Sequence, residues 1–167
     1  MSLTNKIHSL WIAGLLASAT IAAAEVKVGE PFPALAGFGL EGQLPDQAGK
    51  VVLVDFWATW CAPCRASFPA YSVIQRELAD RGLVIIAVSV DKTKAPYDDF
   101  LRKFAPAFAT VRDGGQRMVA DVKVPAMPTS YLLDRHGILR AVHSGFHGDA
   151  TAKELRDEIV KLLEEKS

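Results

Sequence analysis

Two short apolar runs mark the centre of the chain. Residues 51–56 and 83–90 are continuous stretches rich in valine, isoleucine and leucine, which is typical of strands that are covered on both faces. Between them, apolar residues recur at three- and four-residue spacings over 63–80, and Gly82 follows. This spacing predicts a helix that stops at the glycine. A strand, a helix and a second strand in this order favour a parallel crossover unit.

The second half of the chain alternates in the same way. Helical spacings are found over 98–104 and 116–122, with a turn at 113–115 between them. Residues 130–133 and 138–144 flank a polar segment, which predicts a hairpin, and 151–163 has the pattern of an amphipathic last helix. Prolines and glycines over 31–42 predict an entry loop with a small hairpin that turns at Glu41-Gly42. The chain is therefore expected to form one α/β domain.

Composition narrows the classes of function. The chain has 167 residues, 50% of them hydrophobic, which is enough for one domain with its own core. Lysine plus arginine and aspartate plus glutamate each number 19, and no polybasic run occurs, so neither nucleic acid nor an anionic membrane surface is an expected partner. Cys61 and Cys64 are the 2 cysteines, which excludes a network of disulfides and a four-thiolate zinc site within one chain.

The first residues resemble an export signal. Lys6 precedes an apolar stretch over 10–21, and three alanines end at Ala24. We expect a signal peptide over 1–24, cleaved after Ala24, and a mature domain over 25–167. The alternative is an uncleaved anchor, although the apolar stretch is shorter than the roughly 20 residues that span a bilayer. The expected location is the periplasm or another extracytoplasmic compartment, with a membrane tether if the signal is kept. A dithiol that stays reduced there needs a supply of electrons.

The chemistry of the chain is concentrated in Trp-Cys-Ala-Pro-Cys at residues 60–64, where a predicted strand gives way to a predicted helix. Cys61 then lies at the helix N-terminus, where free amide groups and the helix dipole favour a thiolate. Cys64, one turn further on, can reach Cys61 and resolve a mixed disulfide. A structural disulfide and half of a metal site are the alternatives, and we favour a working dithiol.

Other residues near the dithiol fit this interpretation. Asp55 lies six positions before Cys61 in an otherwise apolar run, so we expect a buried carboxyl with a raised pKa that exchanges a proton with Cys64. The alternative for Asp55 is a strand-end residue bonded to backbone. We expect Trp57 in the core and Trp60 partly exposed over the dithiol, where Trp60 would help to dock a substrate.

These segments resemble a known family. The thioredoxin signature resembles residues 54–58, 60–64 and Pro69 of this chain. The cis-proline loop of that family resembles Met127-Pro128-Thr129. The TlpA/ResA branch of exported members resembles the chain at 89–91 and 128–137. The resemblance implies a thioredoxin fold, a mixed central β-sheet flanked by helices, with the N-terminal hairpin extension and an αβ-type insert over 91–124. It also implies a cis Pro128 facing the dithiol, and Met127 whose backbone docks an extended substrate.

The resemblance also implies partners. Cysteine-containing exported proteins are the expected substrates, and a membrane electron donor of the DsbD or CcdA type is the expected source of electrons. The Ala62-Pro63 dipeptide resembles that of reducing thioredoxins, so we favour a protein-disulfide reductase that needs no bound cofactor or metal. Cytochrome c or copper-site maturation is the expected pathway, although 124–129 differs from the loop usual in cytochrome c maturation.

Two other classes of function use the same kinds of residues. A Sco-like copper chaperone would use both thiolates and one of His136, His143 or His147, but such proteins place three residues between their cysteines, and here there are two. These histidines are expected at the surface, near or beyond a hairpin that the family places away from the dithiol. A peroxidase would need a proline, threonine and cysteine spacing that the chain lacks.

Overall fold

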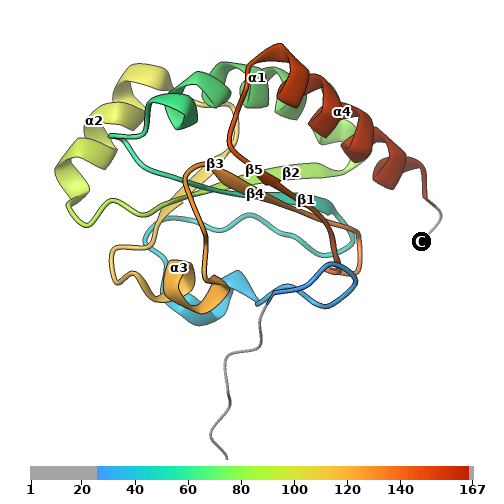
Figure 1. Cartoon of the computed structure of the whole chain (residues 1–167), viewed down its shortest axis with the longest axis horizontal. Helices are drawn as coiled ribbons and strands as arrows, with labels where there is room; N and C mark the ends of the chain where they lie inside the picture. The colour runs from blue at the N-terminus through green and yellow to red at the C-terminus, as the bar shows by residue number, and fades with distance from the viewer. Residues whose placement is uncertain (1–25, 166–167) are drawn as a thin grey trace, which may run out of the picture.

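A mixed five-stranded sheet forms the centre of the protein (Figure 1). The computed structural model describes residues 26–165. Strand order is β3-β2-β1-β4-β5, with β1 parallel to β2, β2 parallel to β3, and β4 antiparallel to both β1 and β5. The strands are β1 (Val51–Trp57), β2 (Leu83–Ser89), β3 (Ala109–Arg112), β4 (Thr129–Leu133) and β5 (Leu139–Ser144). The thioredoxin fold implied by the sequence is confirmed.

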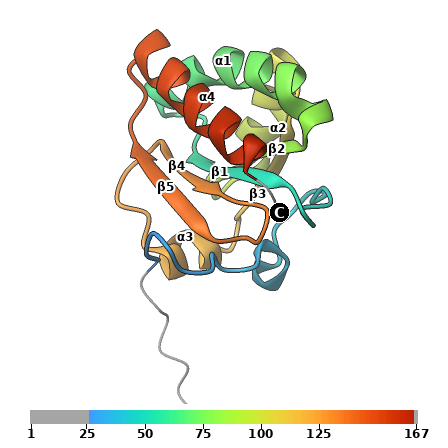
Figure 2. The same cartoon turned by 90° about the vertical axis from the view of Figure 1, so that its right-hand side faces the viewer.

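The two faces of the sheet are covered by different sets of helices. The helices are α1 (Ala62–Leu78), α2 (Lys94–Phe104), α3 (Arg117–Val122) and α4 (Asp149–Glu164), with short 3-10 turns η1 (Leu35–Phe38) and η2 (Ala79–Arg81). Figures 1 and 2 show α1, α2 and α4 on one face, and α3 with the N-terminal segment on the other. Within the described residues, no helix has both the length and the apolar character of a membrane span.

The central strand is buried along its whole length, as its apolar run predicts. Every residue of β1 is buried, because β2 and β4 flank it and helices lie above it. Trp57 is inaccessible, and its ring centroid lies 4.6 Å from that of Phe68 on α1 and 4.7 Å from that of Phe100 on α2. This aromatic cluster fixes the two helices on the sheet beside the dithiol, and it confirms Trp57 as a core residue.

The predicted N-terminal hairpin does not form. Pro31 forms an isolated bridge with Ile138 and Glu41 forms one with Arg112, so the segment pairs with the sheet and not with itself. The physical reason is that proline has no amide to donate to a hairpin ladder, whereas the backbone groups of the segment find partners on the strands it crosses. The predicted signal over 1–24 lies outside the described residues.

The αβ-type insert that the resemblance implies before the cis-proline loop is confirmed. Over 91–124 the chain forms α2, β3 and α3, and β3 extends the sheet beside β2. The residue pattern alone did not locate β3, because Ala109–Arg112 is only 4 residues long and is neither strongly apolar nor regularly alternating. The helix α2 also begins at Lys94, earlier than the predicted 98.

Candidate active site

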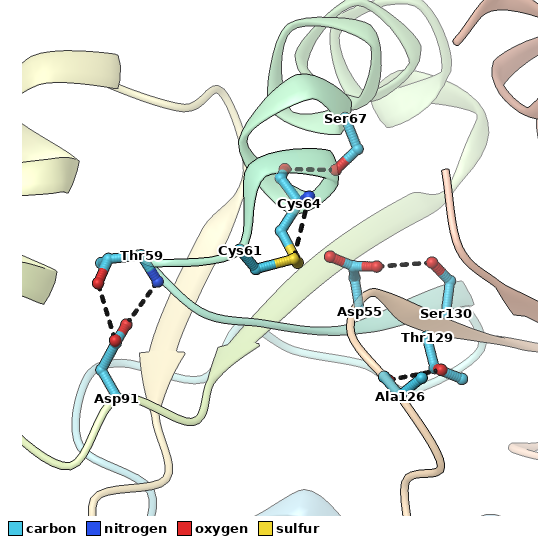
Figure 3. The surroundings of a disulfide bond; sticks show 9 residues. All are labelled: Asp55, Thr59, Cys61, Cys64, Ser67, Asp91, Ala126, Thr129 and Ser130. Atoms are coloured by element: carbon cyan, nitrogen blue, oxygen red, sulfur yellow. Dashed lines mark hydrogen bonds between the residues drawn. A yellow bond between two sulfur atoms is a disulfide. The ribbon is translucent and has the colours of Figure 1, made fainter. Parts of the chain in front are cut away.

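Cys61 and Cys64 form a disulfide at the start of α1. Cys61 occupies the N-cap position, Cys64 lies in the first turn, and their Cα atoms are 5.3 Å apart. The backbone N–H of Cys64 donates to Sγ of Cys61 over 3.3 Å (Figure 3). Cys61 is 6% exposed and Cys64 is inaccessible. The helix amide therefore favours a thiolate at Cys61 in the reduced protein, and Cys61 is the sulfur that an incoming group meets first.

Asp55 lies in the protein interior beside this disulfide. It is fully buried on β1, and its Oδ1 accepts a hydrogen bond of 2.6 Å from the hydroxyl of Ser130 on β4. Burial raises the pKa of Asp55 to about 7, and the Ser130 hydrogen bond acts in the opposite direction. The other oxygen, Oδ2, is buried without a hydrogen-bond partner among the described residues, and Figure 3 shows it on the side of the disulfide. The raised pKa agrees with the prediction from sequence.

The turn that leads into the dithiol is held by a second carboxylate. Asp91 accepts hydrogen bonds from the backbone N–H of Thr59 at 3.0 Å and from its hydroxyl at 2.8 Å. The hydroxyl of Ser89 also donates to Asp91, at 2.7 Å. Thr59 precedes Trp60, whose side chain is 69% exposed, so the turn presents a large aromatic surface to solvent next to Cys61. The predicted partial exposure of Trp60 is confirmed.

The loop before β4 contains the cis-proline that the resemblance implies. The Met127-Pro128 peptide bond is cis, and Met127 is partly buried. The loop is held by the Thr129 hydroxyl, which donates to the carbonyl of Ala126 at 2.9 Å, and by the Gly145 N–H, which donates to the carbonyl of Pro128 at 2.8 Å. Because β4 pairs with β1 in the register Ser130 to Asp55, this loop reaches the end of the sheet where the dithiol lies (Figure 3).

The three histidines do not gather at the dithiol. His136 lies in the turn between β4 and β5, at the opposite end of β4 from Pro128, and His143 pairs with Glu158 at 2.7 Å. His147 is placed differently from the prediction: β5 returns antiparallel to β4, so the loop after it comes back to the end of the sheet where Pro128 lies. Among residues 26–165 no group of three histidine, cysteine, aspartate or glutamate side chains could hold a metal ion.

Several residues of the site escaped the sequence reasoning. Ser130 and Thr59 are common polar residues at positions where a surface or a core role is equally ordinary. The signal that could have found Ser130 is the strand alternation itself, since an antiparallel partner of Asp55 faces the same side of the sheet. Asp91 was noted only as part of the branch resemblance.

Proteins that carry a Cys-x-x-Cys dithiol on a sheet of this order, next to a cis-proline, are thiol-disulfide oxidoreductases of the thioredoxin fold, and fold and site assign the chain to this class. The chain belongs to the thioredoxin-like family, whose model matches residues 49–139. It is 36% identical to the thioredoxin-like protein YneN of Bacillus subtilis, over 72% of this chain and 70% of that protein.

Two further comparisons agree with this class. The chain is 29% identical to the thiol-disulfide oxidoreductase ResA of Bacillus thuringiensis, over 83% of this chain and 80% of that protein. Its fold superposes with a TM-score of 0.77 on the crystal structure of a protein assigned as the thiol:disulfide interchange protein DsbE of Chlorobium tepidum, at 33% identity, over 83% of this chain and 99% of that one. The chain is thus a thiol-disulfide oxidoreductase, similar to the ResA and DsbE proteins.

Proposed function

We propose that this chain is an exported reductase of protein disulfides, which acts on cysteine-containing exported proteins. The observation that carries the proposal is the pair Cys61 and Cys64 at the N-terminus of α1, with the buried carboxyl of Asp55 on the adjoining strand. An accessible nucleophile, a covered resolving thiol and a group that titrates near neutral pH are what dithiol exchange needs. The similarity to ResA and DsbE proteins supports the same chemistry.

The proposed reaction has two displacement steps. The thiolate of Cys61 attacks one sulfur of the client disulfide, forms a mixed disulfide and releases the first client thiolate. Cys64 then loses its proton to Asp55 and attacks Sγ of Cys61, so that the intramolecular disulfide closes and the second client thiolate leaves. Two electrons pass to the client. A membrane dithiol donor of the DsbD or CcdA type returns them to the protein, and the proton on Asp55 goes back to Cys64.

Client docking is assigned to the edge that flanks the dithiol. The backbone of Met127 before Pro128 is available to pair with an extended client segment, and the indole of Trp60 offers apolar surface next to Cys61. A client strand on this edge would bring its disulfide in line with Cys61. Unfolded apocytochrome c and precursors of copper sites are the proposed clients, because each must have its cysteines reduced before it binds its haem or its copper.

The proposed location is the periplasm or another extracytoplasmic compartment, and it rests on the signal-like residues 1–24. N-terminal sequencing of the protein recovered after cell fractionation tests it. Cleavage after Ala24 with recovery in the soluble extracytoplasmic fraction supports export, and an intact N-terminus in the membrane fraction supports a tether. Recovery in the cytoplasm with an intact N-terminus contradicts the proposal.

The variant Cys64→Ala tests the function. It should accumulate client proteins as mixed disulfides through Cys61, because attack survives and resolution is lost. Cys61→Ala is the matched control and should capture none. The captured proteins, released by a reductant and identified, name the clients. The direction of electron flow is tested by equilibration with glutathione, where a potential closer to about −270 mV than to about −120 mV is expected for a reductant.

One experimental outcome would favour a Sco-like copper chaperone over the proposed disulfide reductase. If Cys64→Ala captures no protein, while the reduced wild type binds Cu(I) with a defined stoichiometry, the metal function is the better description. The placement of His136 and His143 away from the dithiol argues against that outcome.

A further inference from the structure

Two hydroxyl groups, those of Ser130 and Tyr71, join Asp55 to the helix that carries Cys64. Ser130 donates to Oδ1 of Asp55 at 2.6 Å, and the hydroxyl of Tyr71 on α1 lies 3.1 Å from that of Ser130. On the same face of α1, the hydroxyl of Ser67 donates to the carbonyl of Cys64 at 2.8 Å. These groups are all buried, so each bond forms away from competing water.

The hydrogen bonds of these hydroxyl groups run in one donor-to-acceptor order, from Tyr71 through Ser130 to Asp55. A hydroxyl carries one proton to donate, and Ser130 gives its proton to the carboxyl oxygen. The Tyr71 hydroxyl must then be the donor in its bond with Ser130. Oδ1 is therefore occupied as an acceptor, and Oδ2 is left as the place where a proton can bind. Oδ2 is the buried oxygen without a hydrogen-bond partner in the described structure, on the side of the disulfide in Figure 3.

We propose that Ser130 and Tyr71 are positioning residues for the proton transfer between Asp55 and Cys64. They turn the carboxyl so that Oδ2 is the oxygen that receives the Cys64 proton, and they stabilise the carboxylate once it forms. In the resolving step the S–H bond of Cys64 breaks, an O–H bond forms at Oδ2, and the S–S bond to Cys61 closes as the client thiolate leaves. The inference rests on the proposed role of Asp55 as proton acceptor.

The surroundings of Asp55 leave few other groups to control its titration. Its neighbours on the flanking strands are Ala87 on β2 and Ser130 on β4, neither of which carries a charge. From α1 the titratable neighbours are Tyr71 and the two cysteines. Burial and the charge of Asp55 both raise the pKa of Tyr71, so Tyr71 stays protonated and remains a donor throughout the range in which Asp55 titrates. Ser130 is thus the direct hydrogen-bond donor to the Asp55 carboxylate.

The experiment follows two quantities across pH: the carbon-13 shift of the Asp55 carboxyl in the oxidised protein, and the rate at which a glutathione group on Cys61 is released by Cys64. In Ser130→Ala the carboxylate loses its donor, so the Asp55 midpoint should rise by about one pH unit. The acid limb of the release profile should move with it, which makes release about tenfold slower below the midpoint. Tyr71→Phe should shift both in the same direction by about half as much.

Matched variants separate positioning from general damage to the fold. Ser130→Thr keeps a hydroxyl and should restore both the midpoint and the release profile. Tyr97→Phe removes another tyrosine hydroxyl, which bonds Thr110 and has no bond to Ser130 or Asp55, and should change neither. If Ser130→Ala or Tyr71→Phe folds poorly, the remaining variant still gives the shift. An unchanged midpoint and release profile in either folded variant would overturn the proposal.

Asp55→Asn distinguishes this inference from the function on which it depends. With asparagine the release profile should lose its acid limb, and Ser130→Ala added to Asp55→Asn should have no further effect on release. If Asp55→Asn leaves release unchanged at every pH, the proton-acceptor role of Asp55 fails. If Asp55→Asn slows release but Ser130→Ala and Tyr71→Phe do nothing, only the positioning role fails.

Discussion

Thr59 is joined to Asp91 by two hydrogen bonds, one from its backbone N–H and one from its hydroxyl, across 32 positions of sequence. Asp91 follows the end of β2, and Thr59 follows the end of β1, so the carboxylate connects the ends of two neighbouring parallel strands. Because Cys61 lies two residues after Thr59, the connection fixes the turn from which α1 and the dithiol begin.

Asp91→Ala should loosen this turn. The part-buried Thr59 and the buried Ser89 lose a charged acceptor, so the free energy of unfolding should fall by about 2–3 kcal/mol. The alkylation of Cys61 in the reduced protein should slow by about fivefold at neutral pH, since a displaced Cys61 loses its contact with the helix amide. Iodoacetamide kinetics across pH measure the effect. Thr59→Ser keeps both bonds and serves as the control, and an alkylation profile of Asp91→Ala equal to wild type contradicts the expectation.

The buried carboxyl of Asp55 should make stability depend on pH. Its pKa rises from 3.8 to about 7 on folding of the oxidised protein, so the folded state holds a proton that the unfolded chain releases. Its contribution is fully present below pH about 4, declines as pH rises, and is lost once pH passes about 7. The decline amounts to about 4 kcal/mol. Denaturant unfolding at pH 4, 6 and 8 measures this decline in the free energy of unfolding. The part of the decline that Asp55 causes should be absent in Asp55→Asn.

Trp60→Ala should weaken the docking of protein substrates and leave the stability of the fold almost unchanged. The indole is 69% exposed, so stability should change by less than about 0.5 kcal/mol. Loss of an aromatic contact at the centre of the docking edge should raise KM for a protein disulfide by about fivefold, with little change for a small aromatic disulfide reagent. Steady-state assays with both substrates test this. Val142→Ala, which removes exposed apolar surface from β5, should leave both unchanged. An equal loss toward both substrates would place Trp60 in the chemistry and not in docking.

Glu41→Ala should destabilise the N-terminal segment. The side chain of Arg112 is 8% exposed, and its guanidinium donates to Glu41, whose side chain is 46% exposed. Removing the carboxylate leaves a buried charge with only the carbonyls of Asp91 and Lys92, and partial exposure of Glu41 limits the loss to about 1–2 kcal/mol. Urea denaturation measures the change. Asp157→Ala, which breaks an exposed pair with Lys153, should cost less than about 0.5 kcal/mol and supplies the comparison.

The sequence predicted those parts of the fold whose signal is local. The apolar runs of β1 and β2 and the helical spacing of α1 were sufficient because these elements are buried on a regular period. The resemblance implied an αβ-type insert, but the residue pattern did not locate β3, because its 4 residues form a strand only by pairing with β2. The hairpin predicted near Glu41 was wrong for the same reason, since that residue pairs with Arg112.

In the candidate site, too, the sequence predicted the residues whose signal is local and not the contacts between distant residues. Cys61, Cys64 and Pro128 were identified from residue spacing and resemblance, and the pKa of Asp55 was inferred from its apolar neighbours in sequence. The bonds from Ser130 to Asp55 and from Thr59 to Asp91 join residues 75 and 32 positions apart. Strand alternation shows which face Ser130 lies on, but no local pattern shows which residue it meets there. Strand register decides which hydroxyl meets which carboxylate, so these contacts became visible only in three dimensions.

The segment over 29–41 crosses beneath the sheet and touches both of its outer strands, at Leu139 where β5 begins and at Arg112 where β3 ends. Backbone groups at the margins of a sheet can recruit a strand from another molecule, which is a common start of aggregation. By occupying part of each margin, one stretch of chain makes lateral self-association of this domain harder. The covered margins leave less of the sheet open to a strand from any other unfolded chain.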